Sequence, residues 1–446
     1  MKSKIKIIAQ EINIETNEVV TEYLAYEKIT TVPQQINELG FSHKEQINIL
    51  HQSQEAILQA QQKIINEQND TCPECSHKTK KSGKFQSDFH SVFTDHKISL
   101  QRKKCTCGWT SKISIDGKYA SALHPDLVEM QCLFGAESSF KKTEAFLAKK
   151  CCASRPINNH SRIQKTINQV GYLLSVIKQE DDWFSSNDPN FSDELILAID
   201  GGYIQSHDAD KRSFEALTAT VYNPNNLVRK DKNHSEIIDK TVVASAKNDH
   251  QISIKRLVKN ACKKQGMNLS TKITFLTDGA KNCWSIASVL EGECKEIVKI
   301  LDWFHIGKKF KNAEHVIPEE LKDEYEKSKW CLWQGNVDKA LMKLDLIKGK
   351  IDNEKTKIGT LITYIKNNQA YLINYQERDI KGLVYTSQLA ESTVNNLINE
   401  RQKHDKRMQW SREGADAVLQ IRSSKQSNDW ESDWNSVQAI FYRKAS

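Results

Sequence analysis

The chain has 446 residues, a net charge of +7 and 11 cysteines. This length is enough for two to four domains with a sizeable core. The odd number of cysteines, the lack of an apolar region at the N-terminus and the lack of any apolar run of about 18 residues argue against a secreted or membrane protein. We therefore expect a bacterial cytoplasmic protein without a membrane partner and with thiols that are free or bound to zinc.

The positive charge is concentrated in one part of the chain. Between Cys72 and Glu180 there are 18 Lys and Arg against 9 Asp and Glu, a net charge of +9, which leaves −2 for the rest. A basic part beside a nearly neutral part indicates an acidic polymer as partner, and we expect DNA, with the protein associated with the nucleoid when bound to it. An ordinary solvated surface is the alternative.

The N-terminal segment predicts a hairpin followed by a helix. Residues Lys4–Asn13 alternate weakly between apolar and polar, and Glu18–Tyr26 can pair with them across Thr16–Asn17. Residues Ser42–Asn66 place apolar side chains near helical spacing among many glutamines. Such a helix indicates packing or an oligomer interface rather than chemistry.

Two cysteine pairs predict a zinc ribbon. Cys72 and Cys75 form a C-x-x-C pair, and Cys105 and Cys107 form a C-x-C pair about 30 residues later, beyond a stretch that resembles a hairpin. Four thiolates on two facing turns are what tetrahedral zinc requires. Two alternatives stay open, namely unliganded buried cysteines and the replacement of one thiol by a histidine, for which the candidates are His77, His90 and His96. A structural zinc would stabilise this small domain and position DNA.

The next segment, up to Lys178, predicts three helices that resemble a helix-turn-helix domain. Asn and Arg side chains can reach base edges, and lysines can contact phosphates. The candidate phosphate contacts are Lys141, Lys142, Lys149 and Lys150. The candidates near the start of the recognition helix are Arg155, Asn158, Asn159 and Arg162. A plain helical bundle with a solvated face is the alternative.

After a polar linker, buried strands end on acidic residues. Leu195–Ile199 is a continuous apolar run that leads into Asp200, and a second run leads into Asp278. Ligand sites in such sheets lie at the carboxyl ends of the strands. Two aspartates at one such edge would repel each other unless a divalent cation lay between them.

A third acid completes the predicted metal site. Ser387 is a plausible N-cap of a helix in which Glu391 lies beside an apolar face. Asp, Asp and Glu supply the hard oxygen ligands that two-metal phosphoryl transfer requires. We expect two Mg²⁺ ions, for which Mn²⁺ can substitute.

A long helical segment separates the second and third acids. Within it, Trp303 is a candidate for stacking on an unpaired base, with core packing as the alternative. His305 is a candidate for contacting the scissile phosphate or orienting a carboxylate, with a structural histidine as the alternative. Beyond Glu391, Lys403 and Arg407 belong to a basic stretch that we expect to follow the DNA.

Taken in order, four stretches resemble bacterial insertion-sequence transposases of the DDE type, and most closely the Kra family. These stretches are Leu195–Gly202, Thr277–Ala280, Asp302–Ile306 and Leu389–Arg422. The last contains MQWSREGADAVLQIR, and Asp302-x-x-His305 resembles a D-x-x-H signature of several DDE superfamilies. The chain departs from the family at Thr386–Gln388, where a glycine-rich approach to the third acid is expected.

The resemblance implies a multidomain α+β and α/β fold with a ribonuclease-H-like core interrupted by an all-α insertion. The expected domains are a hairpin and helix (1–70), zinc ribbon (71–120), helix-turn-helix-like domain (121–180), first part of the core (194–301), insertion (302–385) and last part of the core with the tail (386–446). It further implies cleavage and transfer of double-stranded DNA at element ends and targets, by a homodimer or larger assembly. The alternatives are a nuclease without strand transfer and a catalytically decayed DNA-binding protein.

Overall fold

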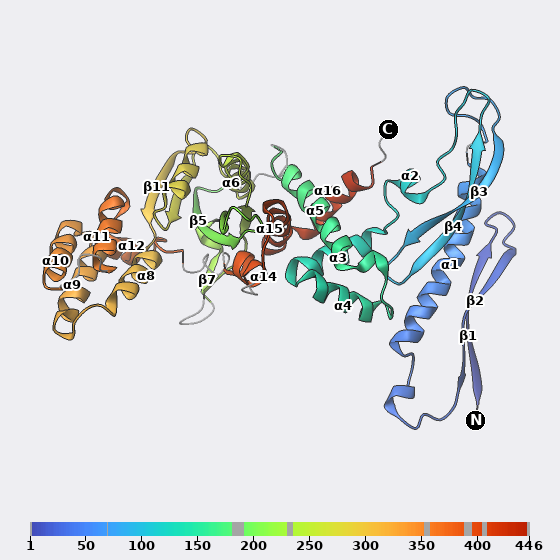
Figure 1. Ribbon diagram of the computed structural model, residues 1–446, viewed down its shortest axis with the longest axis horizontal. Helices are drawn as coiled ribbons and strands as arrows, with labels where there is room; N and C mark the ends of the chain where they lie inside the picture. Colours follow the sequence, from blue (N-terminus) through green and yellow to red (C-terminus); the bar gives the residue numbers. More distant parts are fainter. Residues whose placement is uncertain are drawn as a thin grey trace. The chain divides into compact units, whose positions relative to one another are not determined.

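The computed structural model describes residues 2–68, 70–180, 191–229, 235–351, 357–387, 395–403 and 408–443 (Figure 1). It divides into two compact units, Met1–Val170 with Trp434–Ser446, and Gly171–Asp433. Their helices and strands together form the multidomain mixed fold that the sequence predicts. None of the described helices has the length and apolar character needed to cross a membrane.

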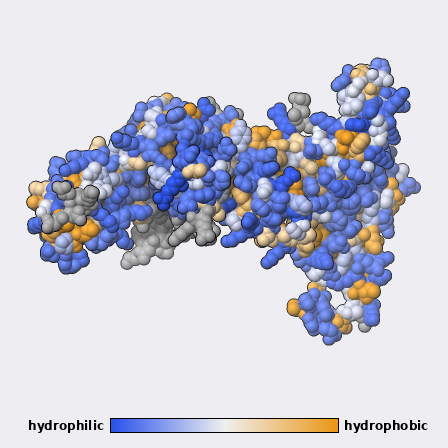
Figure 2. All heavy atoms as spheres, in the orientation of Figure 1, coloured by the Kyte–Doolittle hydropathy of each residue, from blue (hydrophilic) through white to orange (hydrophobic). Residues whose placement is uncertain are grey.

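The first unit begins with an antiparallel hairpin covered on one face by a long helix. The hairpin consists of β1 (Ser3–Ile12) and β2 (Val19–Thr30), and α1 spans His43–Glu67. Ser42 caps α1 in a capping box with Glu45, which fixes where the helix starts. Most of the face drawn in Figure 2 is hydrophilic, and several of the exposed aliphatic side chains belong to this N-terminal segment.

The ribbon follows as a second antiparallel hairpin. Its strands are β3 (Lys80–His90) and β4 (Asp95–Lys104), and a short helix α2 (Ile115–Tyr119) comes after it. Ile98 and Leu100 of β4 are buried with Ile115, and Leu58 and Ile65 of α1 pack against them, so the ribbon shares a small apolar core with α1. A core of this size is one reason to expect a structural metal ion that stabilises the ribbon.

Three helices complete the first unit in sequence: α3 (Pro125–Glu137), α4 (Phe140–Lys150) and α5 (His160–Ile177), which continues beyond Val170. Helices α3 and α5 approach closely at Gly135, where a Cβ atom would lie 2.4 Å from Ile167. The connection between α4 and α5 contains a 3₁₀ turn, Pro156–Asn158. It is longer than the 3–4-residue turn of a simple helix-turn-helix, so the bundle is helix-turn-helix-like.

The second unit is built on a five-stranded mixed sheet. The strands are β5 (Glu194–Gln205), β6 (Ser213–Tyr222), β9 (Thr241–Ser245), β10 (Lys272–Thr277) and β11 (Glu296–Leu301). Their spatial order is β11-β10-β5-β6-β9. Strands β10 and β11 run parallel to β5, whereas β6 is antiparallel to β5 and to β9. This order and these directions are those of a ribonuclease-H-like core.

Smaller elements connect these strands. They are α6 (Ile252–Lys264), α7 (Lys281–Trp284), β7 (Leu227–Arg229), β8 (Ser235–Ile237) and the 3₁₀ helices Pro224–Asn226 and Ser285–Val289. Helix α6 joins β9 to β10 and buries Leu257 and Val258 in the main core.

The insertion after β11 is all helical. Its helices are α8 (Trp303–Glu314), α9 (Lys322–Trp333), α10 (Val337–Gly349), α11 (Lys357–Asn367) and α12 (Tyr375–Ile380), with 3₁₀ turns at Glu319–Leu321 and Gln369–Tyr371. Its buried side chains continue the hydrophobic cluster of the sheet, so core and insertion share one interior.

The chain then returns to the sheet. A π-helical turn (Asn395–Asn399) leads into α14 (Glu400–Gln402), and α15 (Arg412–Gln426) follows, with α16 (Trp430–Phe441) last. Helix α15 is bound to β9 and the loop after it, because Gln420 donates to the carbonyl of Ala244 at 2.8 Å and Asp416 accepts from the backbone of Ala246 at 2.9 Å. Helix α15 is therefore an integral part of the core of the second unit.

Candidate active site and zinc site

Asp200 and Asp278 lie side by side at the carboxyl ends of two neighbouring parallel strands. In the ladder between β5 and β10, Ile199 is the partner of Thr277, and each aspartate is the next residue of its strand. Both aspartates are half-buried. The structure therefore brings together the first two predicted acids, as expected from the strand ends.

The loop that carries Asp278 is held in one conformation. Its carboxylate accepts a hydrogen bond from the backbone N–H of Ala280 at 2.9 Å. Gly279 has a φ of +94°, a region that side chains disfavour, and a Cβ atom there would lie 2.6 Å from the side chain of Asn368. The hydroxyl of Tyr364 donates to the Asp278 carbonyl at 2.8 Å. The insertion thus directly supports the second acid.

Three carboxylates at this end of the sheet lie near enough to Cys283 to act on its thiol. Burial raises the pKa of the Cys283 thiol to about 12, and the carboxylates of Asp278, Asp200 and Glu215 add to this rise. Glu215 is held by the side-chain amide of Asn282 at 2.7 Å. Sequence reasoning missed Glu215, which occupies an ordinary position in β6.

Asp302, at the end of β11, links the sheet to the segment before the third acid. It is fully buried, and its carboxylate accepts hydrogen bonds from the backbone N–H of Ser387 at 3.0 Å, from the Ser387 hydroxyl and from the backbone N–H of Phe304. His305 Nε2 lies 3.6 Å from Asp302 Oδ2. The position of His305 therefore suits orienting a carboxylate, which was one of its two predicted roles.

Glu391 and Arg407 lie outside the described residues, but the chain after Glu391 is in contact with the sheet. Ile398 packs against Gly202 of β5, where a Cβ atom would lie 2.7 Å from its Cδ1 atom. Partial burial lowers the pKa of Lys403, and the carboxylate of Asp200 acts in the opposite direction. Lys403 is therefore near the first acid.

Trp303 packs mainly within the protein. Its ring centroid is 4.9 Å from that of Trp333 and 4.8 Å from that of Tyr375. These contacts favour the core alternative for Trp303, although it also lines a surface cavity.

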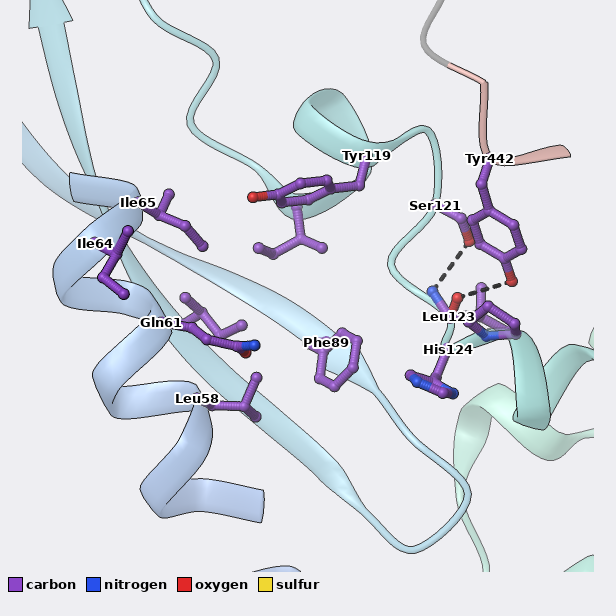
Figure 3. Close-up of a pocket in the computed structure, with 13 residues that line it drawn as sticks. Leu58, Gln61, Ile64, Ile65, Phe89, Tyr119, Ser121, Leu123, His124 and Tyr442 are labelled. Atoms are coloured by element: carbon purple, nitrogen blue, oxygen red, sulfur yellow. Dashed lines mark hydrogen bonds between the residues drawn. The ribbon is translucent and has the colours of Figure 1, made fainter. Parts of the chain in front are cut away.

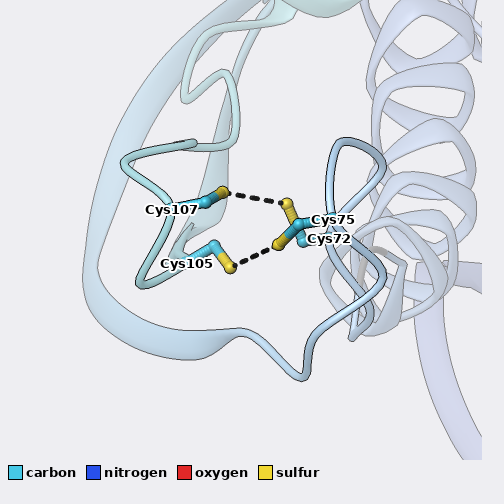
Figure 4. A group of neighbouring side chains, drawn as sticks. All are labelled: Cys72, Cys75, Cys105 and Cys107. Atoms are coloured by element: carbon cyan, nitrogen blue, oxygen red, sulfur yellow. Dashed lines mark hydrogen bonds between the residues drawn. The ribbon is translucent and has the colours of Figure 1, made fainter.

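Four thiols converge in the ribbon (Figure 4). The sulfur atoms of Cys72, Cys75, Cys105 and Cys107 all lie within 4.8 Å of one another. The sulfurs of Cys72 and Cys107 are 3.6 Å apart, and those of Cys75 and Cys105 are 3.4 Å apart. A tetrahedral zinc with Zn–S bonds of about 2.3 Å requires sulfur separations of about 3.8 Å. This cluster can hold zinc, and it is the only group of three or more metal-ligating side chains that converges among the described residues.

The two turns that carry these thiols have similar hydrogen bonds. The backbone N–H of Cys72 donates to His77, and that of Cys105 donates to Trp109, at 2.8 and 2.9 Å. The backbone N–H of Cys107 bonds to Cys105 and lowers the pKa of that thiol to about 6, whereas the pKa values of the neighbouring Cys75 and Cys107 thiols are raised. The cluster contains all four cysteines, so no histidine is needed to replace a thiol; His96, for example, bonds to Glu55 at 2.7 Å.

The candidate DNA contacts in the first unit divide into exposed and buried groups. The exposed group consists of Lys141, Lys142, Lys149, Lys150 and Arg162. Asn159 is partly exposed, and its carbonyl oxygen accepts from the backbone of Arg162 at 2.9 Å, so it caps α5.

Arg155 and Asn158 require a correction. Arg155 is buried, donates to the carbonyl of Ser91 at 2.9 Å and pairs with Asp95. Asn158 is buried and accepts from Gln131 at 2.9 Å. Both side chains are used inside the protein, so the structure gives them a structural role instead of base contacts.

The first unit also contains an apolar cavity of about 380 Å³ (Figure 3). Leu58, Ile64 and Ile65 of α1 line it on one side, and Phe89 and Tyr119 line it on the other. The Tyr442 hydroxyl donates to the carbonyl of Leu123 at 3.0 Å near its edge. Its lining contains no carboxylate that could serve as a ligand for the expected magnesium ions, so the candidate active site is the aspartate edge of the sheet.

No protein-family model matches the sequence, and no curated protein matches it. Among solved structures, the chain has a weak similarity to a Drosophila P element transposase strand transfer complex. The TM-score is 0.24 and the identity 7%, and the match covers 69% of this chain and 80% of that chain. A similarity this weak carries no functional argument.

Proposed function

We propose that this chain is a DNA transposase of the DDE type, of the Kra-type insertion-sequence family, with Asp200, Asp278 and Glu391 as its metal ligands. The observation that carries the proposal is that Asp200 and Asp278 directly follow paired residues of two neighbouring parallel strands. They therefore lie together at the carboxyl edge of a sheet whose strand order is ribonuclease-H-like. Half-buried carboxylates in this position suit hard divalent cations. Two bound Mg²⁺ ions would activate the attacking oxygen and stabilise the leaving oxygen of a phosphodiester.

The described residues on both sides of Glu391 support its role as the third ligand. Ser387, four residues before it, is bound to Asp302 at the end of β11. Ile398, seven residues after it, packs on Gly202 of β5. The chain is therefore anchored to the proposed metal-binding edge of the sheet before and after Glu391.

The basic surface of the first unit supports DNA as the substrate. Lysines at the start and the end of α4, together with Arg162 in the first turn of α5, are exposed and available for phosphate contacts. The zinc cluster would stabilise the ribbon next to them in sequence, without a role in the chemistry.

The test is the substitution Asp278→Asn, with Asp338→Asn on the exposed face of α10 as control. Strand cleavage of plasmid or element-end DNA in Mg²⁺ or Mn²⁺ is expected to be abolished by Asp278→Asn and retained by the control. DNA affinity is expected to be unchanged or higher, because one negative charge is removed. Cleavage that survives in Asp278→Asn would contradict the assignment.

Two further outcomes separate the alternatives. Cleavage without strand-transfer products would indicate a nuclease that does not join DNA. DNA binding without any metal-dependent cleavage by the wild-type chain would indicate a catalytically decayed DNA-binding protein.

A further inference from the structure

A cavity of about 460 Å³ opens directly beside Asp278. Its walls come from the loop after β10, from α8 and from α11 with the residues that follow it. The core and the insertion therefore build this cavity together. Its volume is within the range of roughly 300–1,000 Å³ typical of ligand sites.

The aromatic rings in the cavity wall are already packed. Trp284 is buried and stacks on Tyr371 at 4.1 Å and on Phe275 at 5.7 Å between ring centroids, so its ring is already packed inside the protein. The ring of Tyr364 lies under the Lys309 ammonium group, which is 5.2 Å from the ring centroid. Stacking of a base is therefore not what this cavity offers.

Apart from the carboxylate of Asp278, a proposed metal ligand, the polar side chains of the cavity are lysines, amides and tyrosine hydroxyls. Lys281, from the start of α7, and Lys309, from α8, both line it and are both exposed. Within the described part of the chain, neither lysine forms an ion pair with a carboxylate. The exposed amide of Asn367 adds a neutral donor to the same wall. Two unpaired ammonium groups and an amide suit a phosphate group.

We propose that this cavity binds a phosphodiester of the DNA strand next to the scissile one, with Lys281 and Lys309 as its counter-ions. The inference rests on the proposed function, because the cavity adjoins a proposed metal ligand. A strand held there would be fixed by a neighbouring phosphate while the scissile group faces the carboxylates. Lys281 and Lys309 are therefore positioning residues, and they carry no part of the bond-breaking step.

The experiment uses the full chain and compares Lys281→Gln, Lys309→Gln and the double variant with the wild type. The control is Lys311→Gln, an exposed lysine on the same helix as Lys309 that does not line the cavity. The probe is a fluorescein-labelled DNA duplex of random sequence, and the Kd is measured over a series of salt concentrations. Each lost phosphate contact is expected to reduce the slope of log K against log salt by about 1, so the double variant loses about 2 and the control loses none.

A second measurement separates this inference from the proposed function. Nicking of supercoiled plasmid in Mn²⁺ is expected to show a KM about fivefold higher for each single variant, with kcat changed less than KM. If the double variant nicks DNA with the kinetic constants of the wild type and its salt slope is unchanged, the cavity proposal is overturned and the transposase proposal stands. Reduced slopes without any nicking by the wild type would support the cavity and contradict the catalytic proposal.

A free mononucleotide is the other possible source of a phosphate. Binding of deoxyadenosine monophosphate that is lost in the double variant, with salt slopes for the duplex unchanged, would assign the cavity to a small molecule and overturn the DNA assignment.

Discussion

The carboxylate of Asp302 accepts hydrogen bonds from both the backbone N–H and the hydroxyl of Ser387, which is 85 residues further along the chain. Asp302 is fully buried, and it also caps α8 through the backbone of Phe304. One side chain thus fixes the start of the insertion and its end. The chain enters the segment of Glu391 from this fixed point.

Asp302→Ala is expected to destabilise the second unit by about 3 kcal/mol, because buried donors lose their acceptor. Ser387→Ala removes only the hydroxyl bond and is expected to cost about 1 kcal/mol. Urea unfolding monitored by tryptophan fluorescence measures both values. Equal midpoints for Asp302→Ala and the wild type would contradict the structural role of this carboxylate.

Gly202→Ala tests the contact between β5 and the segment after Glu391. The new Cβ atom would lie 2.7 Å from Cδ1 and 3.3 Å from Cγ2 of Ile398, so overpacking is expected to cost about 1–3 kcal/mol. Adding Ile398→Val removes Cδ1, and the double variant is expected to recover part of this loss in a double-mutant cycle.

Gly307→Ala in α8 is the matched control, because a Cβ atom there meets nothing within 4 Å. It is expected to be neutral or stabilising, since alanine favours a helix over glycine. A similar loss of stability in Gly202→Ala and Gly307→Ala would show that the contact with Ile398 is unimportant.

Zinc removal tests the thiol cluster. The purified chain is expected to contain one zinc, and X-ray absorption is expected to show four sulfur ligands at about 2.3 Å. A chelator or Cys107→Ser is expected to loosen the ribbon, seen as faster hydrogen exchange in β3 and β4, because metal binding is coupled to folding. A nitrogen ligand in the absorption spectrum would revive the histidine alternative.

Acid is expected to loosen α1 from the N-terminal hairpin. Hydrogen bonds from Tyr26, Lys28 and the backbone of Ser42 lower the pKa of Glu45 from 4.5 to about 2. Because the folded pKa lies below the unfolded one, this contribution is complete above about pH 4.5 and is lost as the pH falls towards 2. Hydrogen exchange in α1 between these pH values measures the effect, and Glu45→Gln is expected to remove the pH dependence of this contact.

Local patterns predicted the strands of the core but not all of their lengths. The apolar run Leu195–Ile199 identifies β5, yet the strand continues through Gly201 and Gly202 to Gln205. Glycines ordinarily weaken a strand, and here Gly202 makes room for Ile398. A contact with such a distant residue cannot be read from local spacing.

The region after Asp278 shows the same limit. Its apolar spacing predicts one helix from Asn282 to Leu290, whereas α7 ends at Trp284 and a 3₁₀ helix follows. Trp284 packs against Tyr371 of the insertion, which the spacing of its neighbours does not reveal. Lys309 and Asn367 likewise reach the Asp278 cavity only through tertiary packing.

The bond from Tyr364 to the carbonyl of Asp278 and the close fit of Asn368 on Gly279 bear on how shortened copies of such a gene should be judged. A copy that had lost α11 together with the adjacent Asn368 by deletion would keep both aspartates in its reading frame. It would nevertheless lack the hydroxyl and the amide that hold the loop of the second aspartate in place. Two intact aspartates are thus poor evidence that a shortened copy could carry out the proposed reaction, and the length of the helical segment is the better guide.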